Sequence, residues 1–287
     1  MKKTLLLSGI EVANHFYNSV PERIQSLLNK NIKPGLAVIL IGSNPASKIY
    51  VRKKSEKFKE LGILSETFSL PEKIQQNELL ELIDSLNKDS RFTGILLQLP
   101  LPKHLDSNYL LNKIDPKKDV DGFHPENMGL LFSGNPRYIP CTPKGIIKIL
   151  EYYNIITEQL HSVVIGRSNI VGKPIASLLS SRSDKGNSTV TICHSKTSNL
   201  SYFTQQADIL IAAVGIPQKI KANMVKKSAI IIDVGINRDK NGKIVGDVDI
   251  DSVIDKVGAI TPVPGGVGPM TIAMLVENTI ESAEKLL

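Results

Sequence analysis

The chain has 287 residues, of which 41% are hydrophobic and 22% are charged. This composition is typical of a soluble globular protein with a substantial core, and the length favours two domains over one. No apolar run approaches the roughly 20 residues that cross a bilayer, which excludes a membrane-spanning protein. The net charge of +7 indicates affinity for anions, without choosing among nucleic acid, a phosphorylated cofactor and a polycarboxylate.

The few cysteines and histidines argue against disulfides and metals. Cys141 and Cys193 lie too far apart to indicate a disulfide framework, and the five histidines lack metal-ligand spacing. We therefore expect no metal site. The beginning, Met1 to Leu7, faintly resembles a signal peptide, but its apolar stretch is short and soon reaches Glu11. We interpret it as the first turns of a mature, cytoplasmic protein.

Apolar, β-branched runs alternate with longer helical patterns along most of the chain. Such near-continuous apolar runs suit parallel strands covered on both faces, and their alternation with helices predicts an α/β fold with right-handed crossovers. The candidate strands are Leu36–Ile41, Gly94–Leu99, Ser162–Ile165, Thr189–Cys193, Asp208–Val214, Ala229–Val234 and Ala259–Thr261.

A segment rich in turn-forming residues, Phe132–Thr142, marks a domain boundary. We expect a first domain over residues 1–138 and a second over residues 139–269. Thr142 and Pro143 resemble an N-cap and a first-turn proline, which predicts a helix to about Tyr153. Residues 270–287 also have a helical pattern, and we expect this helix to pack back on the first domain.

The strand Ser162–Ile165 leads into a glycine turn and then into a helix-like stretch, Ile175–Leu179. A strand, a glycine turn and a helix in this order aim free backbone N–H groups and a helix dipole at a phosphate. The dinucleotide fingerprint GxGxxG is absent, since Ser168 stands where its second glycine would be. Taken alone, the turn is equally well explained as plain turn chemistry.

The ends of the following strands strengthen the prediction of a dinucleotide site. No acid follows Thr189–Cys193 to bind ribose hydroxyls, as an NAD site would require. Arg167, Ser195 and Lys196 can instead surround a 2′-phosphate, so NADP is favoured over NAD. Two further strands end at Gly215 and at Gly235. A glycine at such a position allows the backbone to approach a ligand closely, or it only allows a tight turn.

A lysine lies on the apolar face of the predicted helix Ala46–Leu61. The spacing places Tyr50, Lys54, Phe58 and Leu61 on one stripe. Burial disfavours the charged form of an amine and suits it to act as a general base. The ordinary alternative is a lysine stem that covers apolar surface while its ammonium group reaches water. Periodicity does not separate Lys54 from Lys57.

Polar residues follow the strand that begins at Gly94. Gln98 is an amide near the end of an apolar run, and a buried amide needs a partner, which can be a catalytic lysine, a ligand or a neighbouring loop. Asp119 and Asp121 then place two carboxylates in one short turn. Such a pair can bind a metal, cap the turn or recognise an amino-heterocycle, and their spacing does not decide among these functions.

Together these segments resemble the bifunctional methylenetetrahydrofolate dehydrogenase/cyclohydrolase family. The resemblance covers nearly the whole chain and includes a loop with an unusual density of proline and glycine. The motifs that carry it, in chain order, are Tyr50–Lys54, Gln98–Pro102, Lys118–Gly122, Pro140–Pro143, Gly166–Ser168 with Gly172–Pro174, and Pro262–Pro269.

The resemblance implies two α/β domains flanking a cleft, the second a Rossmann-like parallel sheet that binds NADP, in an enzyme that works as a homodimer. It implies that Lys54 is catalytic, that Tyr50 stacks or hydrogen-bonds beside it, that Gln98 tunes it and that Asp121 grips the pterin. The implied folate contacts are Tyr50, Lys54, Gln98, Leu99, Pro100, Asp121, Pro264, Gly265, Gly266, Val267 and Gly268. The implied NADP contacts are Gly166, Arg167, Ser168, Ser195 and Ile236.

The function implied is oxidation of 5,10-methylenetetrahydrofolate with NADP⁺, followed by hydrolysis of the methenyl product to 10-formyltetrahydrofolate. One alternative is a dehydrogenase that lacks the hydrolytic step or acts on a shikimate-type hydroxy acid. Another is an RNA-binding protein, which predicts basic patches studded with aromatic residues. Aromatic residues make up only 5% of the chain, tryptophan is absent and the basic residues are dispersed. We therefore expect no nucleic-acid partner.

Overall fold

The computed structural model describes residues 3–287, so Met1 and Lys2 of the interpreted beginning lie outside the described residues. The chain folds into two compact units. One unit contains the described residues up to His15 together with Thr142–Thr271, and the other contains Phe16–Cys141 and Ile272–Leu287. Across residues 3–287, no helix combines the length and the apolar character that a bilayer span requires.

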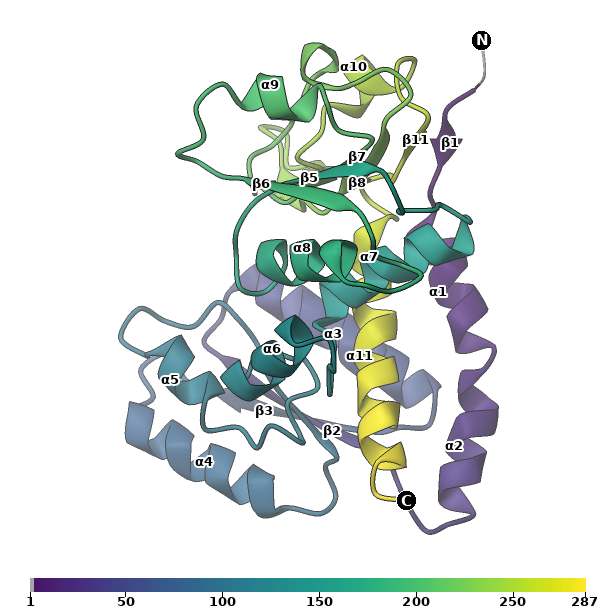
Figure 1. Ribbon diagram of the computed structural model, residues 1–287. Helices are drawn as coiled ribbons and strands as arrows, with labels where there is room; N and C mark the ends of the chain where they lie inside the picture. The colour runs from purple at the N-terminus through teal and green to yellow at the C-terminus, as the bar shows by residue number, and fades with distance from the viewer. Residues whose placement is uncertain (1–2) are drawn as a thin grey trace. The chain divides into compact units, whose positions relative to one another are not determined.

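A six-stranded sheet forms the core of the unit that contains Thr142–Thr271 (Figure 1). Every neighbouring pair of its strands is parallel, which confirms the predicted α/β class. The apolar strands at its centre are almost completely buried, as expected for a sheet covered on both faces. In spatial order the strands are β1 (Leu5–Leu6), β11 (Ala259–Ile260), β8 (Ile230–Asp233), β7 (Ile209–Ala212), β5 (His161–Ile165) and β6 (Thr189–Cys193).

Strand β1 corrects our interpretation of the beginning of the chain. Leu5 and Leu7 donate backbone hydrogen bonds to Gly258 and Ile260, at N···O distances of 3.0 and 2.8 Å. The segment is therefore a sheet strand and not the first turns of a domain. A two-residue strand is too short to show alternation, and its partner lies about 250 residues away in sequence.

Helices cover both faces of the six-stranded sheet. Helices α9 (Leu200–Thr204) and α10 (Ile250–Val253) lie on one face, and α8 (Gly172–Ser180) lies on the other (Figure 1). The side chain of Val253 belongs to the same buried cluster as Leu210 and Ile231. This unit also contains the beginning of α1 (Gly9–Tyr17), α7 (Cys141–Tyr152) from Thr142 on, the 3-10 turn η1 (Ala222–Met224), the antiparallel pair β9 (Asn237–Arg238) and β10 (Ile244–Val245), and the beginning of α11 (Val267–Glu284).

Helix α7 begins two residues earlier than predicted. Because it starts at Cys141, Thr142 lies within the first turn and is not the N-cap. The Thr142 hydroxyl instead lies 3.0 Å from the hydroxyl of Thr271 on helix α11 (Val267–Glu284). The prediction of the helix was confirmed, and the prediction of its cap was wrong.

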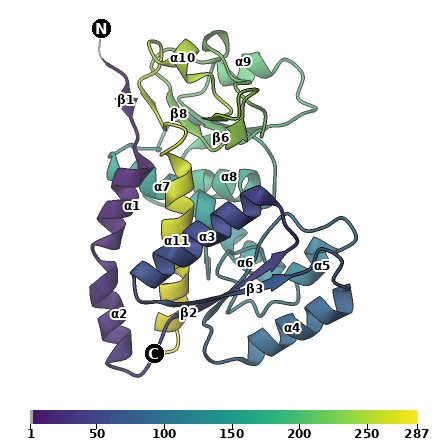
Figure 2. The same cartoon turned by 180° about the vertical axis from the view of Figure 1, so that it is seen from behind.

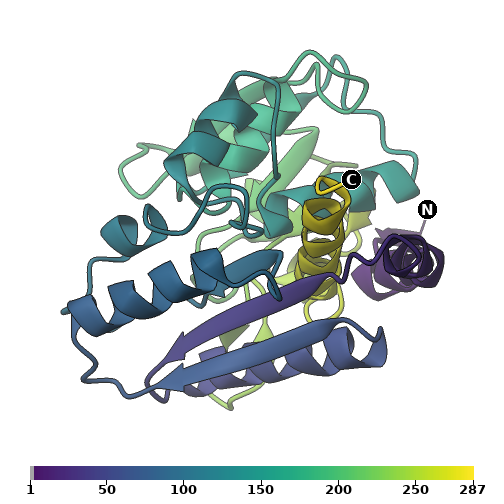
Figure 3. The ribbon, with the colours of Figure 1, turned by 90° about the horizontal axis from the view of Figure 1, so that it is seen from below.

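A three-stranded parallel sheet, ordered β3–β2–β4, forms the core of the other unit. Strand β2 (Gly35–Ile41) is completely buried, and β4 (Gly94–Leu97) flanks it. We did not predict β3 (Leu64–Leu70), because this edge strand contains Ser65, Glu66, Thr67 and Ser69 and lacks an apolar run. Helices α3 (Pro45–Glu60) and α4 (Gln76–Lys88) lie on opposite sides of the sheet (Figures 2 and 3). The unit also contains α2 (Val20–Leu28), α5 (Ser107–Leu111), α6 (Pro125–Phe132) and α11 from Ile272 on.

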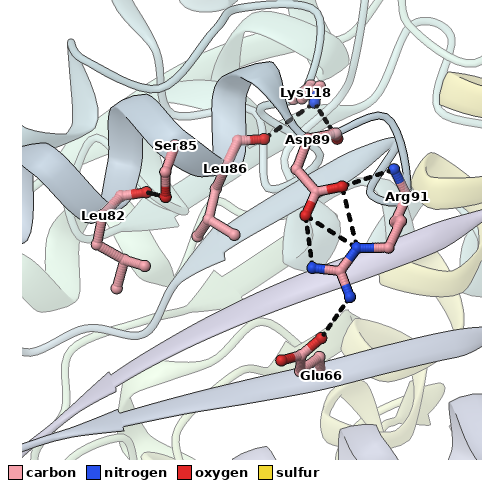
Figure 4. Close-up of polar contacts among 7 residues, drawn as sticks. All are labelled: Glu66, Leu82, Ser85, Leu86, Asp89, Arg91 and Lys118. Carbon is pink, nitrogen blue, oxygen red and sulfur yellow. Dashed lines mark hydrogen bonds and ion pairs between the residues drawn. The ribbon is translucent and has the colours of Figure 1, made fainter.

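Lys118 anchors the segment that leads into the Asp119–Asp121 turn. Its Nζ donates to the carbonyl oxygens of Leu86 and Asp89 at the end of α4, at 3.0 and 2.8 Å (Figure 4). Carbonyls in the last turn of a helix lack intrahelical partners, so a lysine that binds them caps the helix. Beside this cap, Arg91 pairs with the Asp89 carboxylate at 2.6 Å. The cap fixes one end of the turn that carries Asp121.

Candidate functional site

Helix α3 presents the predicted catalytic lysine. The helix begins where the side chain of Asn44 accepts a hydrogen bond from the Ser47 N–H at 3.1 Å, with Pro45 in the first turn. Asparagine is a preferred N-cap, and proline at this position needs no backbone donor. The helix ends at Glu60, so the predicted span of 46–61 is confirmed to within one residue.

The amphipathic pattern of α3 places Lys54 on its buried face. Lys54 is only 6% exposed, Phe58 is completely buried and Tyr50 is half-buried. Arg52 and Glu56 on the other side of the helix are exposed. The predicted burial of this amine is confirmed, and the alternative of an ammonium group extended into water is wrong.

The structure also separates Lys54 from Lys57. The Nζ of Lys57 pairs with Glu60 at 2.6 Å and lies 4.6 Å from the centroid of the Tyr17 ring. These contacts give Lys57 an ordinary role on the flank of the helix. Of these two lysines, Lys54 is therefore the one whose amine faces Gln98 and Asp121.

Gln98 binds Lys54 through one end of its amide and the following loop through the other. The Nζ of Lys54 donates to the Gln98 Oε1 at 3.1 Å. The other end of the amide, Nε2, donates to the Leu99 carbonyl at 2.7 Å, which fixes the orientation of the amide and directs Oε1 at the lysine. The Gln98 N–H binds the Ile39 carbonyl at 2.9 Å and so places the residue just beyond the carboxyl end of β4. Leu99, half-buried, and Pro100, exposed, follow directly.

The two carboxylates of the next turn have different surroundings. Asp119 is buried and accepts hydrogen bonds from the His124 N–H and the Asn127 side chain, both at 2.8 Å. It therefore caps the turn. Across residues 3–287, no three His, Cys, Asp or Glu side chains converge as metal ligands would.

Asp121 is half-buried, and its carboxyl lies close enough to Lys54 to interact with the charge of that lysine. Burial raises the pKa of the Asp121 carboxyl, and the positive charge of Lys54 and a hydrogen bond with Cys141 oppose that rise. The preceding residue, Val120, is held by the Asn278 side chain of α11, which donates to its carbonyl at 2.7 Å. Lys54, Gln98 and Asp121 therefore form one polar group within this unit.

Tyr50 precedes Lys54 by one helical turn. Burial raises the pKa of the Tyr50 phenol above its usual range, so the hydroxyl remains protonated near neutral pH. A protonated phenol is a hydrogen-bond donor as well as an acceptor. Tyr50 thus offers a neutral hydroxyl one helical turn before Lys54 on α3.

The glycine turn after β5 closes tightly on itself. Gly166 has a positive φ of 129°, and a Cβ there would lie 2.4 Å from the Ala213 carbonyl oxygen. A Cβ at Gly172, the first residue of α8, would lie 2.2 Å from the carbonyl oxygen of Gly166. Both glycines are required because neither position has room for a side chain.

The structure corrects one expectation about this turn. The Oγ of Ser168 accepts hydrogen bonds from the N–H groups of Val171 and Gly172 at 3.1 and 3.3 Å. The Lys173 N–H binds the Ser168 carbonyl at 3.0 Å. These three N–H groups at the beginning of α8 are thus occupied by Ser168 and are not left free for a phosphate. The exposed Arg167 side chain and the exposed Ser168 remain as the polar surface of the turn.

The carboxyl end of β6 lies beside this turn. The Gly166 N–H donates to the Cys193 carbonyl at 2.8 Å, and β5 and β6 are neighbours in the sheet. Ser195 and Lys196 follow β6 and are exposed, as Arg167 is. The three predicted 2′-phosphate residues therefore lie at the same edge of two adjacent strands. Ile236, the other predicted contact, follows β8 and is 47% exposed.

The predicted folate loop, Pro264–Gly268, joins β11 to α11. A Cβ at Gly9, the first residue of α1, would lie 1.8 Å from the Gly266 carbonyl oxygen, and the Ile10 N–H donates to the Gly265 carbonyl at 3.2 Å. Close packing against α1 therefore explains the lack of a side chain at Gly9. Pro264 is exposed, Gly265 and Gly268 are half-buried, and Gly266 and Val267 are buried.

We did not single out two buried carboxylates that lie beneath the strand ends of the six-stranded sheet. Asp233, at the end of β8, accepts hydrogen bonds from the N–H groups of Gly235, Asp247 and Val248 at 2.9–3.0 Å. Asp247 is completely buried and accepts four hydrogen bonds of its own. Asp247 lies between Gly246 and Val248 in a segment that also contains Asp249 and Asp251, so the sequence does not single it out.

Asp233 is expected to titrate well above an ordinary aspartate. Burial raises its pKa from 3.8 to about 6. The folded protein keeps this proton at pH values where the unfolded chain has lost it. The resulting contribution to stability, about 3 kcal/mol, is complete below pH 3.8 and is lost as the pH rises through about 6. The carboxyl ¹³C resonance of Asp233, assigned with an Asp233→Asn variant, measures this pKa. A midpoint at or below 4 would contradict it.

Comparisons with known proteins agree with this geometry. The family model described as the tetrahydrofolate dehydrogenase/cyclohydrolase catalytic domain matches residues 7–121, and the model of the NAD(P)-binding domain of the same family matches residues 140–287. A curated relative, the bifunctional protein FolD of Enterococcus faecalis, is 51% identical over 280 residues, which cover 98% of each chain.

Two solved structures extend the agreement and complete the assignment. The bifunctional methylenetetrahydrofolate dehydrogenase/cyclohydrolase of Campylobacter jejuni is 49% identical, with a TM-score of 0.95 and coverage of 99% of this chain and 100% of that one. The Trypanosoma brucei methylenetetrahydrofolate dehydrogenase-cyclohydrolase, solved with NADP and an inhibitor, is 33% identical, with a TM-score of 0.94 and coverage of 100% and 99%. The chain therefore belongs to the tetrahydrofolate dehydrogenase/cyclohydrolase family.

Proposed function

We propose that the chain oxidises 5,10-methylenetetrahydrofolate with NADP⁺ and hydrolyses the methenyl product to 10-formyltetrahydrofolate. The observation that carries this proposal is the contact between the buried Lys54 amine and Gln98, beside Asp121. A dehydrogenase needs to orient two rings, whereas hydrolysis also needs a group that moves a proton from water. Membership of the family supports both activities. The proposal includes a homodimer acting in the cytoplasm.

The strand ends of the six-stranded sheet fit a dinucleotide. The close approach at Gly166 and Gly172 and the exposed Arg167, Ser168 and Ser195 suit a phosphorylated ligand at the carboxyl edge of a parallel sheet. We propose that Ile236 covers another part of the dinucleotide. NADP⁺, when bound, supplies the hydride acceptor. The residues of this chain bind and orient it.

In the other unit, we propose that Lys54 activates the water that attacks the methenyl carbon. Gln98 holds the amine in place through the 3.1 Å hydrogen bond. Tyr50 supplies a neutral hydroxyl to relay the proton or contact the substrate ring. Asp121, Leu99 and Pro100 of this unit bind the folate, and the loop Pro264–Gly268 is a further folate contact that the family resemblance implies. The Asp121 carboxylate is the natural partner of the amino-heterocycle, since ring N–H groups are donors.

A pair of spectrophotometric assays tests the proposed function. The first follows oxidation of methylenetetrahydrofolate with NADP⁺ or NAD⁺, and the second follows loss of methenyltetrahydrofolate absorbance without any nicotinamide. We expect both activities, with NADP⁺ preferred. Oxidation without hydrolysis would favour the dehydrogenase-only alternative, and activity in neither assay would refute the proposal.

A further inference from the structure

We propose that Asp247 is a positioning residue of the dinucleotide half of the enzyme, holding two strand-end loops in register through one carboxylate. The proposal rests on the proposed function, since it assigns Asp247 to the oxidation step alone. Asp247 follows the β9–β10 pair, is completely buried and contacts neither Arg167 nor Ser195 in any hydrogen bond of the described residues. Its action must therefore pass through the loops that it binds.

The first loop follows β7. The Oδ2 of Asp247 accepts the N–H groups of Val214 and Gly215 at 2.6 and 3.0 Å, and its Oδ1 accepts the Ile216 N–H at 3.0 Å. Three successive amides bound by one carboxylate fix the path of this loop. Charge-assisted bonds of this kind are shorter and stronger than bonds between neutral groups.

The second loop follows β8. The fourth donor to Asp247 is the Asn237 side chain, whose Nδ2 lies 2.8 Å from Oδ1. On the other side of the exposed Ile236, a Cβ at Gly235 would lie 2.4 Å from the Asp247 carboxylate. Ile236 is therefore flanked by Gly235, which packs on Asp247, and by Asn237, whose side chain is hydrogen-bonded to Asp247.

The β7 loop in turn contacts the glycine turn of β5. A Cβ at Gly166 would lie 2.4 Å from the carbonyl oxygen of Ala213, the residue before the three bound amides. Gly215 itself has a φ of 69° with no atom within 4 Å of a built Cβ, so its outer side faces open space. A shift of the β7 loop therefore moves both an open glycine surface and the wall of the proposed phosphate turn.

Asparagine cannot replace this carboxylate. Each oxygen of Asp247 accepts two donors, so an amide NH₂ group in either orientation opposes two N–H donors. For Asp247→Asn we expect the KM for NADP⁺ to rise by at least about tenfold. We expect the hydrolysis of methenyltetrahydrofolate, which needs no nicotinamide, to stay within about twofold of the wild type. The KM for methylenetetrahydrofolate should be similarly unchanged.

Two further variants keep the test decisive. Asp249→Asn makes the same charge change two residues away, at a half-buried aspartate with no side-chain cap hydrogen bond, and should leave the KM for NADP⁺ unchanged. Asn237→Ala removes only the donor from the β8 loop, so it should raise that KM less than Asp247→Asn does. If Asp247→Asn does not fold, Asn237→Ala carries the test alone, with a KM equal to that of the wild type as the contrary result.

The outcomes distinguish the inference from the proposed function. Equal losses of oxidation and hydrolysis in a folded Asp247→Asn variant would show a general structural role and overturn the inference. An unchanged KM for NADP⁺ would overturn it as well. A wild-type protein that lacks either activity would instead refute the proposed function.

Discussion

Replacing Lys54 with methionine is expected to lower the rate of methenyltetrahydrofolate hydrolysis by about 10²–10⁴-fold, the range that general acid–base help supplies. Methionine keeps the length and apolar volume of the buried stem but cannot accept a proton. Because Lys54 is 6% exposed and lies on the same stripe as the buried Phe58, an apolar side chain of similar shape should be tolerated. Folate binding, measured by fluorescence or calorimetry, should remain.

Two neighbouring lysines provide matched controls for this prediction. Lys53 is exposed, and Lys57 pairs with Glu60 on the flank of the helix. Lys53→Met and Lys57→Met remove the same charge from the same helix and should retain near wild-type hydrolysis. Wild-type hydrolysis by Lys54→Met would falsify the assigned role. If the variant loses folate binding as well as hydrolysis, Lys54 binds the substrate, and its proposed role in activating water is not supported.

Gly172→Ala is expected to abolish most of the oxidation activity through the loss of NADP⁺ binding. The added Cβ would lie 2.2 Å from the Gly166 carbonyl oxygen, a separation that the backbone relieves only by opening the turn. Backbone strain of this kind costs about 1–3 kcal/mol, which corresponds to roughly a five- to 150-fold loss of affinity. Steady-state measurement of the KM for NADP⁺ checks the effect.

The control for this substitution is a helical glycine with open space around it. A Cβ at Gly129, within α6, meets no atom within 4 Å, so Gly129→Ala should leave both activities unchanged and can increase stability slightly. Hydrolysis should also persist in Gly172→Ala, since Lys54 and Gln98 belong to the other unit. A normal KM for NADP⁺ in Gly172→Ala would mean that this turn does not hold the dinucleotide.

Much of the candidate site was predictable because local periodicity encodes it. The spacing of Tyr50, Lys54 and Phe58 determines which face of α3 is buried, and the structure buries that face. The amide of Gln98 stands out in an apolar run, and it does bind the lysine. Periodicity alone did not separate Lys54 from Lys57, because that distinction depends on Glu60 and Tyr17.

The features that were missed depend on contacts between distant parts of the sequence or on exposed edges. Strand β3 has a polar sequence because it is an edge strand. The capping of α8 by the Ser168 hydroxyl depends on the local path of a turn, which a glycine pattern does not specify. Asp247 binds amides more than 30 residues earlier in the chain, and nothing in the local sequence distinguishes it from the neighbouring Asp249 and Asp251.

The pairing of β1 with β11 has a consequence for how the protein is made. Leu5 is synthesised more than 250 residues before its hydrogen-bond acceptor, the Gly258 carbonyl. This edge of the six-stranded sheet is therefore completed only after β11 has been synthesised. A fragment expressed from Thr142 onward would lack this strand and leave the backbone edge of Ala259 and Ile260 open to other chains.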